Sequence, residues 1–514
     1  MNSNNGAPLL DPQLVASLPD STARRLLVHA LEHPLPRDGR RVFVNRTLRM
    51  ETIRFVGFDL DWTLAAYDHD TLAELIFTLG LERLVAAHGY PRAILRAEAR
   101  PRFARRGLML DVEAGIVLKM SRHRYVGRAY HGREYLDVSE RARLYRHEPV
   151  NPASDRFTIA DTLFEMPEVD IFSELIELNR HQPERLPIES YQQLARDVRA
   201  AIDGIHADGT LKARILADLP RYLPREPELV LALRRLALGG RKLLLITNSE
   251  WFYTDALCRY LFDDALPGKA GWRQIFDLVV VSSGKPGFFR KQRPFVVLDA
   301  SGNPHGETAV PAWGGAYAGG SREGLMKLLE VPGEQVLYVG DHIYGDILST
   351  KMSSTWRTAL VLSELEDELA VLQQMSAQQR VLEALRVELG DLGAHMDDLN
   401  DVLSLYRALR TNGSATHEPA TDPAIGHIET QLAGLRSEHK GLRRHARRVQ
   451  HRLSTALNPY WGSLFKQGAN KSFFGAQVDH FACIYTSRVS NLASYGSNHY
   501  FRVMRDAMMH EWGL

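Results

Sequence analysis

Four short apolar runs constrain the fold of this chain more than any other feature of its sequence. Each run has the length of a buried strand, and polar residues follow it closely. The runs are Ile53–Phe58, Leu243–Ile246, Phe276–Val281 and Val336–Val339, and the polar residues after them include Asp59, Thr247, Lys285 and Asp341. Apolar strands of this kind are typical of a parallel sheet that is covered on both faces. We therefore predict an α/β fold with a Rossmann-like parallel sheet as its core.

The length of the chain indicates several domains. A single hydrophobic core does not organise 514 residues, and the roughly 180 residues between the first two runs far exceed one crossover helix. We predict a partly disordered N-terminal segment over 1–40 and a core in two parts, 41–120 and 216–365. A large cap domain is inserted between them over 121–215, and a helical region follows over 366–514.

The C-terminal region shows helical patterning. Leucines after Leu365 recur at spacings of three and four residues, and the stretch 411–426 is typical of a loop between helices. The second helix carries a basic run, Arg443, Arg444, Arg447 and Arg448. We interpret this run as a solvated helix face or a subunit contact, and nucleic-acid binding as the less favoured alternative.

Composition excludes several classes of protein. A net charge of +1 argues against a general polyanion-binding role. Cys258 and Cys483 are the two cysteines, so we expect neither a disulfide framework nor a thiolate zinc site, and a reducing, cytoplasmic setting fits best. The N-terminus does not read as a signal peptide, and no apolar run approaches the length of a membrane span. We expect no membrane partner.

Asp59 and Asp61 follow the first run and can divide the work of covalent catalysis. One carboxylate can attack an electrophile while the other moves a proton, so Asp59 is the candidate nucleophile and Asp61 the candidate acid and base. An anionic nucleophile that approaches a phosphate needs positive charge nearby. The alternative for this pair in isolation is an Asx turn or a surface Ca²⁺ loop.

Asp341 and Asp346 after the last run suit Mg²⁺, which takes few protein carboxylates and keeps several waters. For Asp346 a role as helix N-cap is the structural alternative, and a zinc site through His342 lacks further ligands at the required spacing. Thr247, Asn248 and Ser249 can hold phosphate oxygens at a strand end, although such residues are also ordinary turn formers. Lys285 can neutralise a transferring phosphoryl group.

The order of these residues resembles the four motifs of the haloacid dehalogenase superfamily: Asp59-x-Asp61-x-Thr63, Thr247, Lys285 and Gly340-Asp341 with Asp346. Longer segments are similar to the cytosolic purine 5′-nucleotidases that prefer IMP and GMP. These segments are Arg41–Arg46, Gly57–Leu64, Asp161–Glu168, Thr247–Ser249, Gly340–Asp346 and Gly462–Phe465. The resemblance extends over most of the chain, and motifs of this length are highly specific.

The resemblance implies Mg²⁺-dependent hydrolysis of a purine nucleoside 5′-monophosphate through an aspartyl-phosphate on Asp59. It places Mg²⁺ among Asp59, the backbone carbonyl of Asp61, Asp341 and Asp346. Phosphate would lie against Thr247, Asn248, Ser249 and Lys285. It also implies a homo-oligomer, a dimer or a tetramer, and adds phosphate transfer to a nucleoside as a second outcome of the same intermediate.

The resemblance further implies a set of base-recognition residues: Phe164, Arg199, Asp203, His206 and Lys212. Phe164 would stack on the purine, while Arg199 and Asp203 share one helix face and can pair with polar atoms of the base. From the residues alone, an ordinary surface salt bridge is the favoured interpretation of Arg199 and Asp203, and core packing is the alternative for Phe164. Asp161, Glu165 and Met352 depart from the pattern of the regulated animal relatives, so an altered or absent response to nucleotide effectors is expected. The alternatives to a nucleotidase are a phosphatase for another small phosphate ester and an inactive nucleotide-binding protein.

Overall fold

The structure is a computed structural model that describes residues 40–503 except 101, 147–148, 266–270 and 413–422. The prediction for the N-terminal segment concerns residues that lie almost entirely outside this part. The chain forms two compact units: one holds the residues through Glu366 and those from Leu464 onward, and the other is Asp367–Ser463. Within the described ranges no helix is long and apolar enough to cross a membrane.

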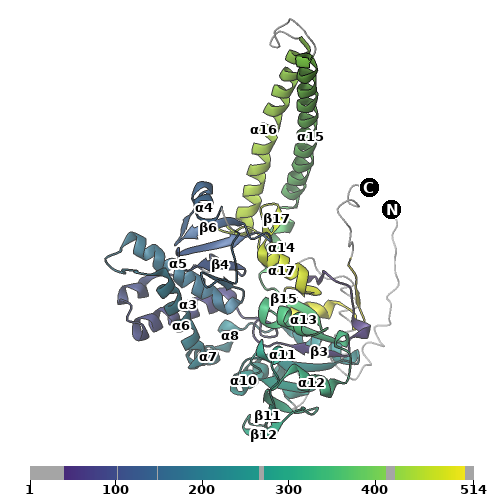
Figure 1. Ribbon diagram of the computed structural model, residues 1–514. Helices are drawn as coiled ribbons and strands as arrows, with labels where there is room; N and C mark the ends of the chain where they lie inside the picture. Colours follow the sequence, from purple (N-terminus) through teal and green to yellow (C-terminus); the bar gives the residue numbers. More distant parts are fainter. Residues whose placement is uncertain (1–39, 101, 147–148, 266–270, 413–422, 504–514) are drawn as a thin grey trace. The chain divides into compact units, whose positions relative to one another are not determined.

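The first unit is built around a ten-stranded sheet in the order β1-β18-β15-β14-β3-β9-β10-β13-β11-β12. Figure 1 labels four of these strands, β3, β11, β12 and β15. All pairs from β18 to β13 are parallel, and the outer pairs are antiparallel. The central strands are β14 (Val336–Gly340), β3 (Phe55–Phe58), β9 (Lys242–Ile246) and β10 (Leu278–Val281). The outer strands are β1 (Phe43–Val44), β11 (Phe295–Leu298), β12 (Pro304–Thr308), β13 (Ala316–Gly319), β15 (Arg357–Val361) and β18 (Ile484–Thr486).

The four predicted strands are therefore neighbours at the centre of one parallel sheet, and the predicted fold class is confirmed. Phe58 lies opposite Val339 on one side and Leu245 on the other, and Ile246 lies opposite Val280. This register brings the carboxyl ends of the four strands to one edge. The side chains of β3 are all buried, as expected for a strand that is covered on both faces.

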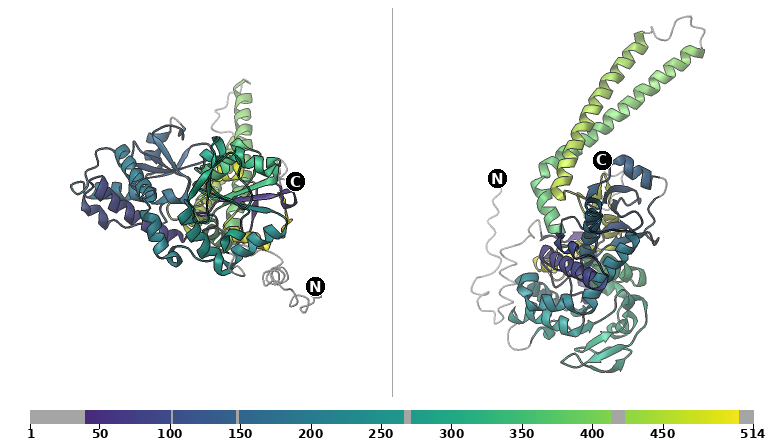
Figure 2. Two further views of the ribbon diagram at one scale, coloured as in Figure 1. Left: turned by 90° about the horizontal axis from the view of Figure 1, so that it is seen from below. Right: turned by 90° about the vertical axis from the view of Figure 1, so that its left-hand side faces the viewer.

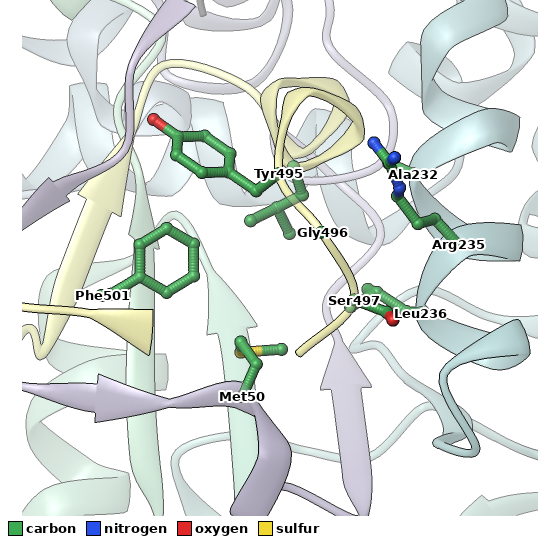
Figure 3. Close-up of a pocket in the computed structure, with 9 residues that line it drawn as sticks. Met50, Ala232, Arg235, Leu236, Tyr495, Gly496, Ser497 and Phe501 are labelled. Carbon is green, nitrogen blue, oxygen red and sulfur yellow. The ribbon is translucent and has the colours of Figure 1, made fainter. Parts of the chain in front are cut away.

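Helices cover the sheet. Phe288 and Phe289 of α11 (Gly287–Arg290) and Leu325 and Leu329 of α12 (Arg322–Leu329) pack with inward-facing strand residues in one apolar cluster. Helix α9 (Pro227–Leu238) contacts β9. Helix α10 (Trp251–Phe262) begins shortly after the end of β9. A small cavity lies where α9 meets Met50 and the segment Leu492–Phe501 (Figure 3). Its volume of about 10 Å³ corresponds to roughly one water molecule, so it does not hold a nucleotide.

A second, antiparallel sheet has the order β7-β6-β5-β4-β8. Its strands are β4 (Leu108–Asp111), β5 (Ile116–Met120), β6 (Val126–His131), β7 (Glu134–Tyr135) and β8 (Phe157–Ala160). Helices α3 (His69–Ala87), α5 (Met166–His181) and α6 (Tyr191–Ala207) pack together beside it. A Cβ atom on Gly80 of α3 would lie 2.7 Å from Ile171 and 3.3 Å from Ile202, so this glycine allows the three helices to approach closely.

These elements start earlier than the predicted cap. The sequence interpretation assigned residues 41–120 to the core, but β4 and β5 belong to the second sheet and α3 packs on α5 and α6. The difference arises because apolar patterning identifies a helix without showing what it packs against. We propose that the inserted segment extends from about His69 to α8 (Leu219–Tyr222).

The second unit contains a helical hairpin. After α14 (Leu365–Gln374), α15 (Ser376–Asn412) and α16 (Pro423–Leu457) run side by side in opposite directions (Figure 2). The predicted loop at 411–426 falls between these helices, and its residues 413–422 lie outside the described part. Leu382 and Leu385 pack against Ala446 at one end of the hairpin, and Leu403 packs against Ile425 and Leu432 at the other.

The prediction of a helical region over 366–514 is wrong for most of residues 464–503, and residues 504–514 lie outside the described part. The segment from Leu464 belongs to the first unit, where β18 pairs with β15 and β1 and where β19 (Tyr500–Phe501) pairs with β2 (Leu48–Arg49). One helix, α17 (Phe473–Phe481), lies between β17 (Asn470–Lys471) and β18. Long-range pairing decides the structure of this segment, and short strands leave little periodicity to detect.

Candidate active site

Asp59 lies directly after β3, at the edge where the four central strands end. Its backbone N–H donates to Val339 O at 2.9 Å, which ties it to the neighbouring strand. The side chain accepts hydrogen bonds from Leu60 N and Lys285 Nζ, both at 2.8 Å to Oδ1, and is 13% exposed. Burial raises the pKa of Asp59 well above its ordinary value; Lys285 opposes this effect, and Asp346 and Asp341 add to it.

Asp341 and Asp346 complete a group of three carboxylates with Asp59. One oxygen from each of the three lies within 4.8 Å of the others. Asp341 follows β14, and Asp346 lies in a π-helical turn over Ile343–Leu348. Gly340 makes this turn possible, because a Cβ atom at that position would lie 2.4 Å from Asp346 Oδ2. Burial and Asp346 raise the pKa of Asp341 to about 7.

Lys285 provides the positive charge in this group. Its Nζ lies 2.8 Å from Asp59 Oδ1 and donates to Asp346 Oδ1 at 2.9 Å and to the Tyr338 hydroxyl at 3.0 Å. Burial alone would lower the pKa of Lys285, but Asp346 and Asp59 outweigh it and hold that pKa well above the ordinary value.

Arg106 Nη1 also lies 3.9 Å from Asp341 Oδ2, but Arg106 is paired with Glu364. The three buried carboxylates therefore share one cation of their own, Lys285, and the donor set accommodates a further cation. Hard oxygen donors fit Mg²⁺.

Asp61 lies beside this group, and hydroxyl groups hold both of its side-chain oxygens. Tyr67 donates to Oδ1 at 2.7 Å, and Ser249 donates to Oδ2 at 2.6 Å. The Tyr67 hydroxyl also lies 2.8 Å from that of Tyr253. The turn after Asp61 places Trp62 at φ 56°, a left-handed backbone that a residue with a side chain rarely adopts. The site therefore fixes the orientation of Asp61 through hydroxyls that can reverse the direction of their hydrogen bonds.

The Thr247–Ser249 segment supports the same edge of the sheet. Thr247 is buried, and its Oγ1 accepts a hydrogen bond from Ser249 N at 3.0 Å. The Asn248 side chain donates to Lys285 O at 3.0 Å and accepts from Lys285 N at 2.7 Å. The predicted phosphate-binding residues are thus brought together, but the Asn248 side chain is engaged in holding the Lys285 loop.

Arg106 is a residue of this site that the sequence did not reveal. It precedes β4, is buried, and donates from Nη1 to the backbone oxygen of Asp341 at 2.7 Å. Its Nε donates to Glu364 Oε1 at 2.8 Å, and its Nη2 donates to Glu364 Oε2. Burial would raise the pKa of Glu364, but Arg106 overcomes this and lowers it to about 2. No local motif marks Arg106, because its partners are distant in the sequence.

Phe164 connects the inserted segment to the core edge. Its ring lies 5.9 Å from that of Trp62 and 6.4 Å from that of Tyr67, measured between centroids. The imidazole of His206, on α6, lies edge-on at 5.3 Å. Burial lowers the pKa of His206 to about 4, and Lys212 contributes to the shift, so this imidazole is neutral near pH 7.

Two of the other candidate base-recognition residues, Arg199 and Asp203, lie on α6, and Lys212 lies on the next helix, α7 (Thr210–Ala217). Arg199, on α6, donates to Glu165 Oε1 at 2.9 Å and places Nε 2.8 Å from Glu168 Oε2. Asp203 is exposed one turn further along the helix. Lys212 pairs with Glu250, near the start of α10. Arg199 is therefore held by two acidic residues of the chain, while Asp203 is open to solvent.

A second contact joins the inserted segment to the core sheet. Asp161 of the inserted segment places its Oδ1 2.9 Å from Nε2 of His342, which follows β14. Burial would lower the pKa of His342, but the hydrogen bond that its ring donates to Asp161 raises it to about 9. Asp161 and Glu165 are two of the positions where this chain departs from the regulated relatives, and Asp161 N donates to Glu165 Oε2 at 3.1 Å. The side chain of Met352, the third such position, lies outside the described part.

Residues 42–513 match the model of the 5′ nucleotidase family. A 5′-nucleotidase domain-containing protein of Dictyostelium discoideum is 30% identical over 499 residues, covering 94% of this chain and 77% of that protein. The 5′-nucleotidase domain-containing protein 2 of Rattus norvegicus is 28% identical over 485 residues, covering 91% and 80%. A crystal structure of a predicted phosphoglycolate phosphatase from Haemophilus somnus covers 60% of this chain and 85% of its own, at 13% identity and a TM-score of 0.26, a value too low to support an inference.

Proposed function

Because this chain belongs to the 5′-nucleotidase family, as its motifs predicted, we propose that it hydrolyses purine nucleoside 5′-monophosphates of the IMP and GMP type with Mg²⁺. Membership of this family identifies the chain as a phosphoric monoester hydrolase. The observation that carries the proposal is the set of three carboxylates and Lys285 at the ends of four neighbouring parallel strands. Such a set suits transfer of a phosphoryl group to a carboxylate.

In the proposed first step, an oxygen of Asp59 attacks phosphorus and the bond from phosphorus to the 5′ oxygen breaks. Asp61 gives a proton to the departing oxygen, so the nucleoside leaves neutral. In the second step, Asp61 takes a proton from water, the water oxygen attacks phosphorus, and the aspartyl-phosphate bond breaks to release phosphate. If a nucleoside hydroxyl replaces the water, the same steps transfer the phosphoryl group.

Lys285 orients Asp59 for the first step, and the hydroxyl groups around Asp61 orient this residue for proton transfer in both steps. The ammonium of Lys285 holds Asp59 in place and offsets part of the repulsion between carboxylate and phosphate. A protonated Asp61 can donate to Tyr67, provided that Tyr67 donates to Tyr253. Asp59, Asp341 and Asp346, with the backbone carbonyl of Asp61, would hold Mg²⁺, which supplies further positive charge to the phosphate oxygens.

The proposed purine preference is supported by the aromatic contacts of Phe164. This ring and the neutral His206 offer apolar surface close to Trp62 and Tyr67, beside the acid and base Asp61. Arg199 and Asp203 provide a donor and an acceptor for base atoms. A phosphatase for a small ester without a base would not need these groups.

Phosphate release from a panel of IMP, GMP, AMP, CMP, UMP and glycerol phosphate, with and without Mg²⁺, tests the proposal. We expect the highest kcat/KM for IMP or GMP. Equal rates for all six esters would favour the general phosphatase, and nucleotide binding without phosphate release would favour the inactive protein.

Removal of divalent cations should abolish phosphate release, and Mg²⁺ should restore it. We also expect the melting temperature to rise with added Mg²⁺, because a cation that binds only the folded protein stabilises it. Asp59→Asn should weaken this shift. Calorimetry or dye-based melting of the chelated protein measures it, and an unchanged rate and melting temperature after chelation would contradict the metal assignment.

Phe164→Ala should raise KM for IMP about tenfold, because stacking on one base contributes about 1–3 kcal/mol. The kcat/KM for glycerol phosphate should change little, since that ester has no base. Tyr135→Ala, which removes a half-exposed aromatic ring of β7, is the matched control. Equal losses for both substrates would show that Phe164 only supports the fold.

The proposed cellular setting is the cytoplasm. Cys258 and Cys483 are both buried and unpaired, which is usual for proteins that fold under reducing conditions.

A further inference from the structure

Trp62 combines a buried, unpaired donor with an uncommon backbone conformation. The residue is 3% exposed, and none of the described residues accepts a hydrogen bond from its indole Nε1. A buried donor without an acceptor keeps the full cost of its desolvation, so such groups are rare in folded proteins. Next to an active site, an unpaired donor points to an acceptor that arrives with the substrate.

Two other buried tryptophans of the same unit show the usual arrangement. Trp272 Nε1 donates to Asp255 Oδ1 at 2.8 Å, and Trp356 Nε1 donates to Met326 Sδ at 3.2 Å. Both tryptophans are 2% exposed. Deep burial of an indole ring is therefore compatible with a paired N–H in this chain, and Trp62 differs from these residues in lacking a partner among the described residues, not in its depth.

The backbone holds Trp62 in a conformation that a residue with a side chain rarely adopts. Its φ of 56° lies in the left-handed region. The turn is fixed by Leu60 O, which accepts hydrogen bonds from the backbone N–H groups of residues 63–65 at 3.2, 2.9 and 2.8 Å. Strained residues persist where the surrounding structure determines them, and they concentrate at ligand-binding sites. The strain and the unpaired N–H are separate observations on the residue that follows Asp61.

The neighbours of the indole place it between the acid and base Asp61 and the purine site. Its ring lies 5.3 Å from that of Tyr67, whose hydroxyl donates to Asp61, and 5.9 Å from that of Phe164. In the proposed function, Asp61 protonates the 5′ oxygen and Phe164 stacks on the purine. The ribose is the part of the nucleotide that joins these two points. Its hydroxyls can accept a hydrogen bond, and the indole N–H can only donate one.

We propose that Trp62 is a specificity-determining residue whose indole N–H donates to a ribose hydroxyl, 2′ or 3′, of the bound nucleotide. This role rests on the proposed function, because it requires a nucleoside monophosphate as substrate. Binding pairs a donor that folding leaves unpaired, so part of the affinity for a ribonucleotide comes from removing this cost. An analogue without the hydroxyl leaves the donor unpaired and is bound more weakly.

The side chains around the indole allow this contact to form. Nε1 is shielded from solvent in this structure. Two of its ring neighbours, Phe164 and His69, are only half-buried, and the ring of His69 lies 6.0 Å from the indole. Side chains at a binding site commonly change rotamer when a partner binds, so a purine that stacks on Phe164 can turn these rings and uncover the N–H.

Kinetics with IMP, 2′-deoxy-IMP and 3′-deoxy-IMP test this role. In the wild type, kcat/KM should fall about tenfold or more for the analogue that lacks the paired hydroxyl, mainly through KM, and should change little for the other. Trp62→Phe keeps an aromatic ring and removes the donor, so its kcat/KM values for the three substrates should lie within about threefold of one another. Ratios within one variant separate the hydrogen bond from a general loss of packing.

Trp356→Phe is the matched control, because it makes the same change at a buried tryptophan whose N–H is paired within the core. This control should keep the wild-type preference among the three sugars. Urea unfolding should show a smaller loss of stability for Trp62→Phe than for Trp356→Phe, because the first change also removes an unpaired donor. A larger loss for Trp62→Phe would contradict the unpaired state of its N–H.

Two further results would overturn this role. One is a wild type with equal kcat/KM for the three sugars, a result that decides the question even if Trp62→Phe fails to fold. The other is a folded Trp62→Phe variant that keeps the wild-type preference. A wild type that releases phosphate from phenyl phosphate but from no nucleotide would instead overturn the proposed function and, with it, any role of Trp62 in binding ribose.

Discussion

Asp59→Asn should lower the rate of phosphate release from IMP by about 10⁴-fold or more, the scale seen when a catalytic nucleophile is removed. The amide has nearly the shape of the carboxylate but cannot attack phosphorus. The free energy of unfolding should change little. Burial, Asp346 and Asp341 all disfavour the charged form of Asp59, and the amide of the variant carries no charge. Lys285 keeps its hydrogen bond to Asp346 in the variant.

Phosphate release and thermal unfolding, measured on the same preparation, check both parts of this expectation. Glu51→Gln is a suitable control, since this exposed carboxylate precedes β3 and contacts none of the site residues described above. Trapping of a phosphorylated chain after acid quenching should succeed with the wild type and fail with Asp59→Asn. Activity of the variant within tenfold of the wild type would assign the nucleophile elsewhere.

Arg106→Met should reduce the free energy of unfolding by about 3–5 kcal/mol, the usual result of removing one partner from a buried ion pair. It leaves Glu364 buried without its cation and Asp341 O without its donor. The pKa of Glu364, about 2 against an ordinary 4.5, corresponds to about 3 kcal/mol in favour of its ionised form, the net of an opposing burial effect and the dominant attraction of Arg106. Both arguments place this among the most destabilising single changes in the chain.

Urea unfolding of the full chain measures the effect. The double variant Arg106→Met/Glu364→Met should regain much of the loss, because two apolar side chains of similar volume replace the pair. The lowered pKa of Glu364 also sets a pH window. Its stabilisation is complete above the unfolded pKa of about 4.5 and is lost as the pH falls towards 2. Equal destabilisation in the single and double variants would contradict this account.

The sequence predicted the parts of the fold that repeat a local pattern. Four apolar runs ended at polar residues, and all four are adjacent strands of the parallel sheet. The resemblance implied that Asp59, Asp341 and Asp346 share one Mg²⁺ site, and one oxygen of each lies within 4.8 Å of the others. The leucine spacing and the loop at 411–426 predicted two successive helices, which the structure shows as α15 and α16.

Long-range partners could not be predicted in the same way. Arg106 gives no local signal, since Glu364 and Asp341 lie more than 200 residues away in the sequence. Asn248 is predicted to contact the phosphate, but its side chain holds the backbone N–H and carbonyl of Lys285 instead. The sequence alone does not show where these backbone groups lie. The prediction for Ile484–Thr486 was wrong because three residues show no strand period, and their conformation depends on β15 and β1.

The place of β18 has a consequence for synthesis of the chain. This strand lies between β15 and β1 in the sheet, so β1, near the start of the described chain, acquires its partner only after residues 484–486 have left the ribosome. Until then the edge of β15 exposes unpaired backbone groups, a state prone to association with other chains. The hairpin, whose two helices are close in sequence, can form earlier because its contacts are local. During translation the hairpin can therefore fold before the sheet of the catalytic core is complete.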